Sequence, residues 1–550
     1  MAELEEKKRK KGRADSFASG VAILSLSAVI VKIIGLVYKI PMLTLLGSEG
    51  MGYFNSAYEI YALFCVIATA GLPVAMSVMI SSSRSRGDVS RIFSVSALLF
   101  IILGVLGTAV MIAFALPLSR LLGSESAVYC MLSIAPTVFF ICLSSVYRGY
   151  FQGQGRMLPT AISQIIEAAL KLILGLVFAI IALRSGFDGQ IVAAFATLGL
   201  TLGVAVSALY LAICKRLDAR REDRISDTIS AGEGKRAIFS ALIRTAVPIT
   251  LSSAVISLGK IIDMTVILRR LQDIGYSSPE AFSAYGCYTT LALPLFGLAP
   301  ALISSVALPL VPAISSAVAE KDIDRQAEVI SNALKLTAVL SLPISFGLAL
   351  FSSEILGLLF AGEHEAIAVA SPLLSLLGLS VTMSCMITVG NAILQAYSRA
   401  SLPILSMAAG SIIKFILAYI LIGNGKINIA GAPISTFFCD LAINAVNFYC
   451  IGRLCPRKIS VSKLLARPCA AALVSVACAR IGYAVCEARF GKSGIITLVF
   501  VAAAAVFYLA ALLIFGAIDR EELSGLPILS RVTDRSESRS KINRSGINKI

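Results

Sequence analysis

The chain has 550 residues, of which 57% are hydrophobic and only 15% are charged, and its mean hydropathy is +0.87. Soluble globular proteins carry about 25% charged residues, so this composition excludes a chain with a water-facing surface along its whole length. The formal net charge of +16 lies in tails and loops, where Lys and Arg fix topology and meet anionic lipid headgroups. We therefore expect membrane lipids, and no nucleic acid, as partners.

Apolar runs of membrane-crossing length recur along the chain, for example at 92–118 and 191–213. About twenty apolar residues in a helix cross a hydrocarbon core of about 30 Å, and a helix satisfies its own backbone hydrogen bonds in lipid. The pattern predicts an all-α integral membrane protein of about fourteen transmembrane helices. Their expected positions are 18–46, 52–80, 90–118, 127–151, 158–183, 190–213, 238–268, 281–316, 329–351, 366–397, 401–422, 429–451, 460–486 and 494–517.

Alternate loops differ in positive charge. One set holds 20 Lys and Arg residues and the other holds 7; the richer loops are 81–91, 148–156, 214–236, 319–328, 398–400 and 453–467. The positive-inside rule places the richer set in the cytoplasm, and an even number of spans then puts both basic termini there too. The first span is longer than a signal peptide's apolar core and lacks a small-residue cleavage site. We expect a multi-pass protein of the bacterial cytoplasmic membrane that keeps this span.

The longest polar interior segment divides the helices into two groups of six, with two more at the end. The expected organisation is a basic cytoplasmic tail at 1–17, an N-lobe of helices 1–6 at 18–213, a cytoplasmic linker at 214–237, a C-lobe of helices 7–12 at 238–452, helices 13–14 at 453–517 and a basic cytoplasmic tail at 518–550.

Short patterns in the first half recur at matching spacing in the second. Ala57-Tyr58 and Pro73 return as Ala284-Tyr285 and Pro300, and Gln152, Arg156 and Lys171 return as Gln395, Arg399 and Lys414. Apolar helices can resemble one another by chance, but matches in chain order favour a true repeat. Six spans per half preserve orientation, so the expected repeat is parallel, about an axis along the membrane normal. Transporters built this way hold their substrate between the two halves.

Several charged residues fall inside the predicted spans, where each costs about 3 kcal/mol on insertion scales. The residues that we predict to line a substrate cavity are Lys32, Lys39, Glu59, Lys171, Lys260, Asp263 and Lys414. The lysines would attract an anionic group such as a diphosphate.

Local explanations for these charges stay open. Lys39 lies near a helix end and can snorkel, and Glu167 with Lys171, like Lys260 with Asp263, can neutralise one another at helical spacing. Asp440 fits a hydrated helix end.

The sequence also suggests which residues couple transport to an ion and which helix bends. Glu59 is a carboxylate suited to ion coupling; whether the membrane potential, Na⁺ or H⁺ drives the protein stays open. Four prolines make helix 8 the expected bending element: Pro294, Pro300, Pro309 and Pro312. We predict no catalytic residue, no metal site and no cofactor.

One stretch carries a family resemblance. Residues 32–87 read KIIGLVYKIPMLTLLGSEGMGYFNSAYEIYALFCVIATAGLPVAMSVMISSSRSRG, and residues 306–315 read VALPLVPAIS. Both resemble the polysaccharide-transporter branch of the multidrug/oligosaccharidyl-lipid/polysaccharide (MOP, MATE-like) exporter superfamily, closest to the stage V sporulation protein B and MurJ-type lipid II flippase groups.

The resemblance implies two six-helix lobes plus two C-terminal helices, a cationic cavity, and alternating access. It also implies a flippase that moves a lipid-linked oligosaccharide or peptidoglycan precursor from the inner to the outer leaflet, with cell-envelope biosynthesis enzymes as further partners. Lys32 stands where the flippases carry a cavity arginine, but Cys65 and the stretch Tyr285–Tyr288 stand where they carry two more. Another polyprenyl-diphosphate-linked glycan therefore stays open beside lipid II.

Two other functions are alternatives. A drug/cation antiporter of the same fold would need cavity carboxylates, whereas buried lysines predominate here. A membrane glycosyltransferase or polymerase would need a catalytic site, for which the one motif is Asp322-Ile-Asp324 in a cytoplasmic loop. We favour a transporter that is not an enzyme.

Overall fold

The computed structural model describes residues 2–83, 85–222, 234–399, 401–455, 457, 461–491 and 493–516. Every regular element within these ranges is helical, which confirms the all-α prediction. The first elements are α1 (Ala2–Thr69), α2 (Leu72–Ser82), α3 (Arg86–Leu121), α4 (Ala127–Ile134), α5 (Thr137–Gly153), α6 (Leu158–Arg184), α7 (Gly189–Glu222), α8 (Lys235–Asp273), α9 (Ser278–Cys287) and the π-helix η1 (Tyr288–Ala292). They are followed by α10 (Leu293–Ala319), α11 (Ile323–Leu350), α12 (Ser352–Leu359), α13 (His364–Ala396), α14 (Ser401–Ile422), η2 (Asn428–Ala430), α15 (Gly431–Leu454), α16 (Val461–Phe490) and α17 (Gly494–Ile514).

Thirteen stretches of the described chain are long and apolar enough to cross a membrane. The first of them, Leu26–Ser82, has 57 residues, about twice the length that one crossing needs. Within it α1 leaves helical geometry at Gly47, where φ is 66° and ψ is 176°, a left-handed conformation that glycine adopts without steric cost. Gly47 thus separates two membrane helices, and the prediction of about fourteen spans is confirmed.

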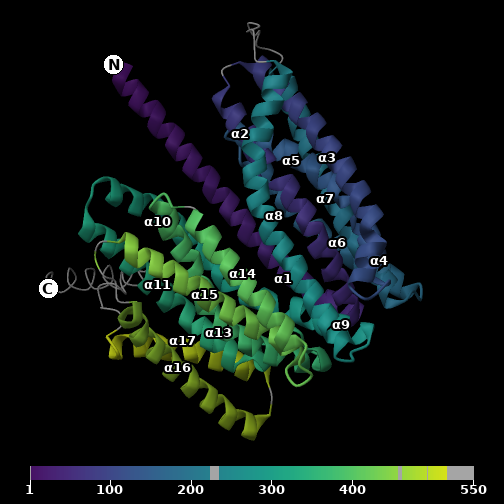
Figure 1. Ribbon diagram of the computed structural model, residues 1–550, viewed down its shortest axis with the longest axis vertical. Coiled ribbons are helices and arrows are strands. Elements are labelled where there is room, and N and C mark those ends of the chain that lie inside the picture. Colours follow the sequence, from purple (N-terminus) through teal and green to yellow (C-terminus); the bar gives the residue numbers. More distant parts are fainter. Residues whose placement is uncertain are drawn as a thin grey trace, which may run out of the picture. The chain divides into compact units, whose positions relative to one another are not determined.

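The chain forms two compact units. Unit 1 comprises Met1–Pro294 and Phe415–Ala432, and unit 2 comprises Leu295–Lys414 and Pro433–Ile550. Helices α1 to α9, η1, the last turns of α14 and η2 thus belong to unit 1 (Figure 1). Of the predicted linker, residues 223–233 lie outside the described residues, and so does the predicted tail 518–550.

Glycines bring the helices of unit 1 close together. A Cβ at Gly52 of α1 would meet the backbone of Phe282 in α9, and one at Gly286 of α9 would meet the backbone carbonyl of Ser48. Gly199 of α7 lies equally close to α6, and these two helices run side by side (Figure 1). Small residues permit such close backbone approach in membrane helices, so the second membrane helix of α1 is fixed against α9.

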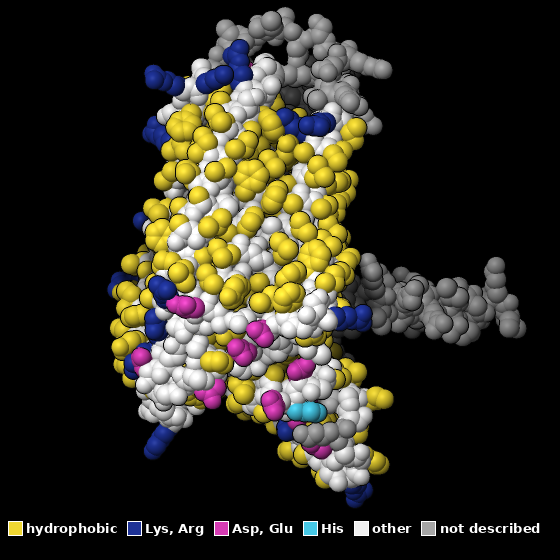
Figure 2. All heavy atoms as spheres, turned by 90° about the vertical axis from the view of Figure 1, so that its right-hand side faces the viewer, with side chains coloured by type: hydrophobic (Ala, Val, Ile, Leu, Met, Phe, Trp, Pro, Cys, Tyr) yellow, Lys and Arg dark blue, Asp and Glu magenta, His cyan; other side chains and the backbone are white. Residues whose placement is uncertain are grey.

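One face of unit 1 is apolar. Figure 2 shows a broad band of hydrophobic side chains, with Lys and Arg gathered beyond one end of it. On α3, for example, Leu98, Val105 and Leu106 are each more than half exposed. Such a surface is stable in lipid and not in water, in agreement with a membrane-spanning protein.

The helix that was expected to bend is irregular at one place. In η1 the N–H of Leu293 donates to the carbonyl of Tyr288, five residues back, instead of to Thr289, four residues back. Pro294 follows and has no N–H to give to Thr290. The carbonyl of Thr289 is therefore released from its usual donor, and π-helical turns of this kind are frequent at functional sites.

Candidate functional site

The released Thr289 carbonyl has a lysine as its partner. Lys39 in α1 donates from Nζ to the Thr289 oxygen at 2.7 Å. Asn55, also in α1, donates from Nδ2 to the Thr289 hydroxyl at 2.9 Å and to the Thr290 hydroxyl at 2.8 Å. Lys39 therefore makes a specific bond inside the protein, which is more than the snorkelling considered from sequence.

A second lysine lies nearby on α6. The Lys171 ammonium lies 4.5 Å from the ring centroid of Tyr58 and 5.4 Å from that of Tyr38. Both aromatic rings belong to α1, so α1 and α6 share this site. Cation–π contacts of this kind stabilise an ammonium without neutralising its charge.

Lys171 does not pair with the carboxylate that its spacing along α6 suggests. Glu167, one turn before it on α6, accepts a hydrogen bond from Arg148 Nη2 of α5 at 2.8 Å. The Arg148 guanidinium also donates from Nε to the Ser163 hydroxyl at 3.1 Å and from Nη2 to the Ser207 hydroxyl at 3.4 Å. The local neutralisation of Lys171 by Glu167 that the sequence spacing allows is thus replaced by a tertiary ion pair.

We call Lys39, Lys171, Tyr38, Tyr58 and Glu59 the cationic cluster. Lys39 lies within electrostatic range of both Lys171 and Glu59. None of these three charged groups forms an ion pair with a residue that the structure describes. Two ammonium groups and one carboxylate leave a net positive charge among apolar helices, and a bound anion would offset the repulsion between the lysines.

The remaining predicted site residues are not part of the cationic cluster as defined. Lys32 on α1 and Lys260 on α8 are exposed, and Asp263 on α8 is half-buried. Asp263 and Glu59 both lie within electrostatic range of the Tyr285 phenol, which places Asp263 near the cationic cluster. Lys414 belongs to unit 2.

In unit 2, Lys414 lies within electrostatic range of Asp440 on α15. Asp440 is only 8% exposed, and its Oδ2 accepts no hydrogen bond from the part of the chain that the structure describes. It lies in the middle of α15 rather than at its end, so the interpretation of Asp440 as a hydrated helix end is wrong.

The aspartates of the Asp322-Ile-Asp324 motif have structural roles. Asp322 caps α11 by accepting the Arg325 N–H at 3.0 Å, and Asp324 pairs with Arg457 at 2.6 Å. No group of three or more His, Cys, Asp or Glu residues able to hold a metal occurs within the described ranges. The motif thus offers no support for a nucleotide-sugar site.

The sequence analysis missed two features of the site. It assigned Arg148 to the cytoplasmic loop 148–156 and not to the ion pair with Glu167, and it did not predict the π-helix η1. A signal for the first existed, since an intramembrane Glu167 needs a cationic partner. A signal for the second existed in Pro294, which deprives Thr290 of a donor.

The fold and the cationic cluster define a multi-pass membrane protein of the transporter class. Residues 17–318 match the family model described as Polysaccharide biosynthesis protein, and residues 248–420 match the MatE model. The chain belongs to the polysaccharide biosynthesis protein family, within the MOP exporter superfamily. The family resemblance noted in its sequence is thereby confirmed.

Individual relatives agree with this assignment. The chain is 27% identical over 531 residues to stage V sporulation protein B of Bacillus subtilis (strain 168), covering 94% of this chain and 99% of that one. It is 23% identical over 414 residues to the lipid II flippase MurJ of the same organism, covering 72% and 76%. Its fold is similar to that of the lipid II flippase MurJ in an inward closed conformation, with a TM-score of 0.69, 16% identity, and 90% and 98% coverage.

Proposed function

We propose that this transporter is a flippase that carries a polyprenyl-diphosphate-linked glycan from the inner to the outer leaflet of the bacterial cytoplasmic membrane. The names of its relatives support a lipid-linked substrate, because one of them is a lipid II flippase. We further propose that the protein works by alternating access and has both termini in the cytoplasm, as the distribution of Lys and Arg among its loops favours.

The observation that carries the proposal is the pair Lys39 and Lys171. Both lysines lie among membrane helices, and neither forms an ion pair with a carboxylate within the described ranges. A diphosphate carries at least two negative charges and accepts hydrogen bonds from each lysine. Its binding would replace the repulsion between the two cations by two attractive contacts.

Other lysines extend the proposal along the path. Lys32 and Lys260 are exposed on α1 and α8, where they would guide the same anion. Lys414 of unit 2 would take part in a later step. Glu59 is proposed as the coupling carboxylate, because it lies within electrostatic range of Lys39 and is half-buried.

A second candidate function is the exchange of an organic cation for an ion. The match of residues 248–420 to the MatE model and the combination of Glu59 with the rings of Tyr38 and Tyr58 favour it, because carboxylates and aromatic rings attract cations. The two functions make opposite demands on the cluster, since a glycolipid diphosphate needs the lysines and an organic cation needs Glu59.

The test is complementation of a bacterium depleted of its lipid II flippase, scored together with the accumulation of lipid-linked precursor. Lys39→Gln combined with Lys171→Gln should abolish growth and raise the precursor level, whereas Lys235→Gln at the exposed start of α8 should behave like the wild type. A doubly substituted protein that is made in normal amounts and still complements would refute the glycolipid proposal. Resistance to organic cations that is lost with Glu59→Gln alone would favour the second function.

A further inference from the structure

A polar pocket lies in unit 1 apart from the cationic cluster. It has a volume of about 390 Å³, which is within the range of sites for small organic ligands. Its lining comes from the Gly47 break of α1, the turn between α3 and α4, the start of α7 and the start of α9. The main polar members are Glu49, Tyr53, Ser126, Asp188, Gln190 and Ser278.

The pocket belongs to the outer side of the membrane by the charge rule. Its lining residues lie in or directly beside the loops 47–51, 119–126, 184–189 and 269–280, which belong to the set that is poor in Lys and Arg. The proposed orientation therefore places this pocket where a translocated headgroup would arrive.

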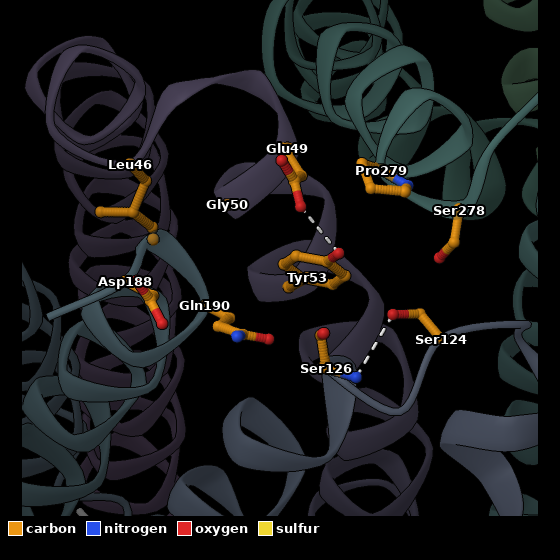
Figure 3. A pocket seen from close by; sticks show the side chains of 11 residues that line it. Leu46, Glu49, Gly50, Tyr53, Ser124, Ser126, Asp188, Gln190, Ser278 and Pro279 are labelled. Carbon is orange, nitrogen blue, oxygen red and sulfur yellow. Dashed lines mark hydrogen bonds between the residues drawn. The ribbon is translucent and has the colours of Figure 1, made fainter.

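The side chains of the pocket converge on one space. Figure 3 shows Ser126, Gln190 and Ser278 pointing toward the surroundings of Tyr53. The Tyr53 hydroxyl donates to Glu49 at 2.8 Å, which holds that carboxylate on one wall. The Ser278 hydroxyl oxygen is buried and has no hydrogen-bond partner among the described residues, so it is available to a ligand.

The chemistry of the lining excludes some ligands and favours one class. Its lining residues include two carboxylates, Glu49 and Asp188, and no Lys or Arg, so a phosphate would be repelled. The hydroxyl groups of a sugar both donate and accept hydrogen bonds. They can donate to the carboxylates of the pocket, and they can donate to or accept from its Ser hydroxyls and its Gln amide.

We propose that this pocket binds an uncharged sugar unit, and that in export it receives part of the glycan headgroup on the outer side. The role in export depends on the proposed function, whereas sugar binding itself does not. The pocket and the cationic cluster would then divide the substrate between them: the cluster holds the diphosphate and the pocket holds a sugar ring.

The test is saturation-transfer NMR on the full-length protein in detergent, with N-acetylglucosamine and glucose as probes. Gly189 offers a steric variant, because it lines the pocket and a side chain there would meet no atom within 4 Å of its Cβ. Gly189→Phe and Gln190→Ala should lose the sugar signal that the wild type shows. Gly425→Phe is the matched control, because Gly425 lies in another outer loop and is equally open.

Two outcomes would overturn the inference: no sugar signal with the wild type, or an equal signal in Gly189→Phe. The Lys39→Gln and Lys171→Gln variants should lose complementation but keep the sugar signal, because they change the cationic cluster and leave the pocket intact. Sugar binding that persists while complementation fails in the wild type would reject glycolipid export alone. Complementation by the wild type without sugar binding would reject the pocket alone.

Discussion

The ion pair between Arg148 and Glu167 leads to a prediction about Lys171, which forms no ion pair of its own with Glu167. Arg148 is 11% exposed and Glu167 is 23% exposed in their side chains. Removal of one partner of such a pair costs about 3–5 kcal/mol when the remaining charge stays unpaired. In Arg148→Met, however, Glu167 can turn to Lys171, four residues on, at a spacing that brings side chains together. We expect the substitution to lower the free energy of unfolding by about 2–4 kcal/mol. We also expect Glu167 to neutralise Lys171, so that the cationic cluster no longer binds an anion.

The measurement combines thermal unfolding in detergent with precursor accumulation in flippase-depleted cells. Arg148→Met should unfold at a lower temperature and should fail to relieve the accumulation. Arg148→Met with Glu167→Gln should recover most of both properties, because replacement of a buried ion pair by neutral groups is often close to neutral. The reasoning is refuted if the double variant transports no better than Arg148→Met, or if Arg148→Met alone transports normally.

Three further predictions concern single residues. Gly286→Leu should prevent the close approach of α9 to α1 at Ser48 and lower stability by at least about 1–3 kcal/mol; normal melting of that variant would contradict the packing described. Glu59→Gln should change the dependence of transport on pH or sodium if this carboxylate couples an ion, and unchanged dependence in transport assays would reject that role. Lys32→Ala should abolish glycolipid export at normal protein levels, and full export would remove Lys32 from the path.

The membrane helices could be predicted because lipid imposes a simple rule: each crossing needs a long apolar run, and hydropathy reports such runs. Even the division of α1 followed from sequence, since the polar, glycine-containing stretch 47–51 interrupts two apolar runs. The structure adds the cause, which is the positive φ of Gly47.

The cluster was only partly predictable, because partner choice is a tertiary property. Spacing along a helix paired Lys171 with Glu167, but Arg148 reaches Glu167 from α5. Hydropathy showed that Lys39 is within a span, but its bond to Thr289 depends on a π-helical turn in a segment 250 residues away. The polar pocket collects residues from four separate segments of the chain, and no single stretch of sequence displays it.

The account depends most on the claim that Lys39 and Lys171 bind a diphosphate. Its most direct test is equilibrium binding of undecaprenyl diphosphate and of undecaprenol, compared in the purified wild type and in the Lys39→Gln/Lys171→Gln variant. Each charge-assisted hydrogen bond contributes about 1.5–3 kcal/mol, so the wild type should prefer the diphosphate by at least about 100-fold. The double variant should lose most of that preference. An unchanged preference in the variant would contradict the claim.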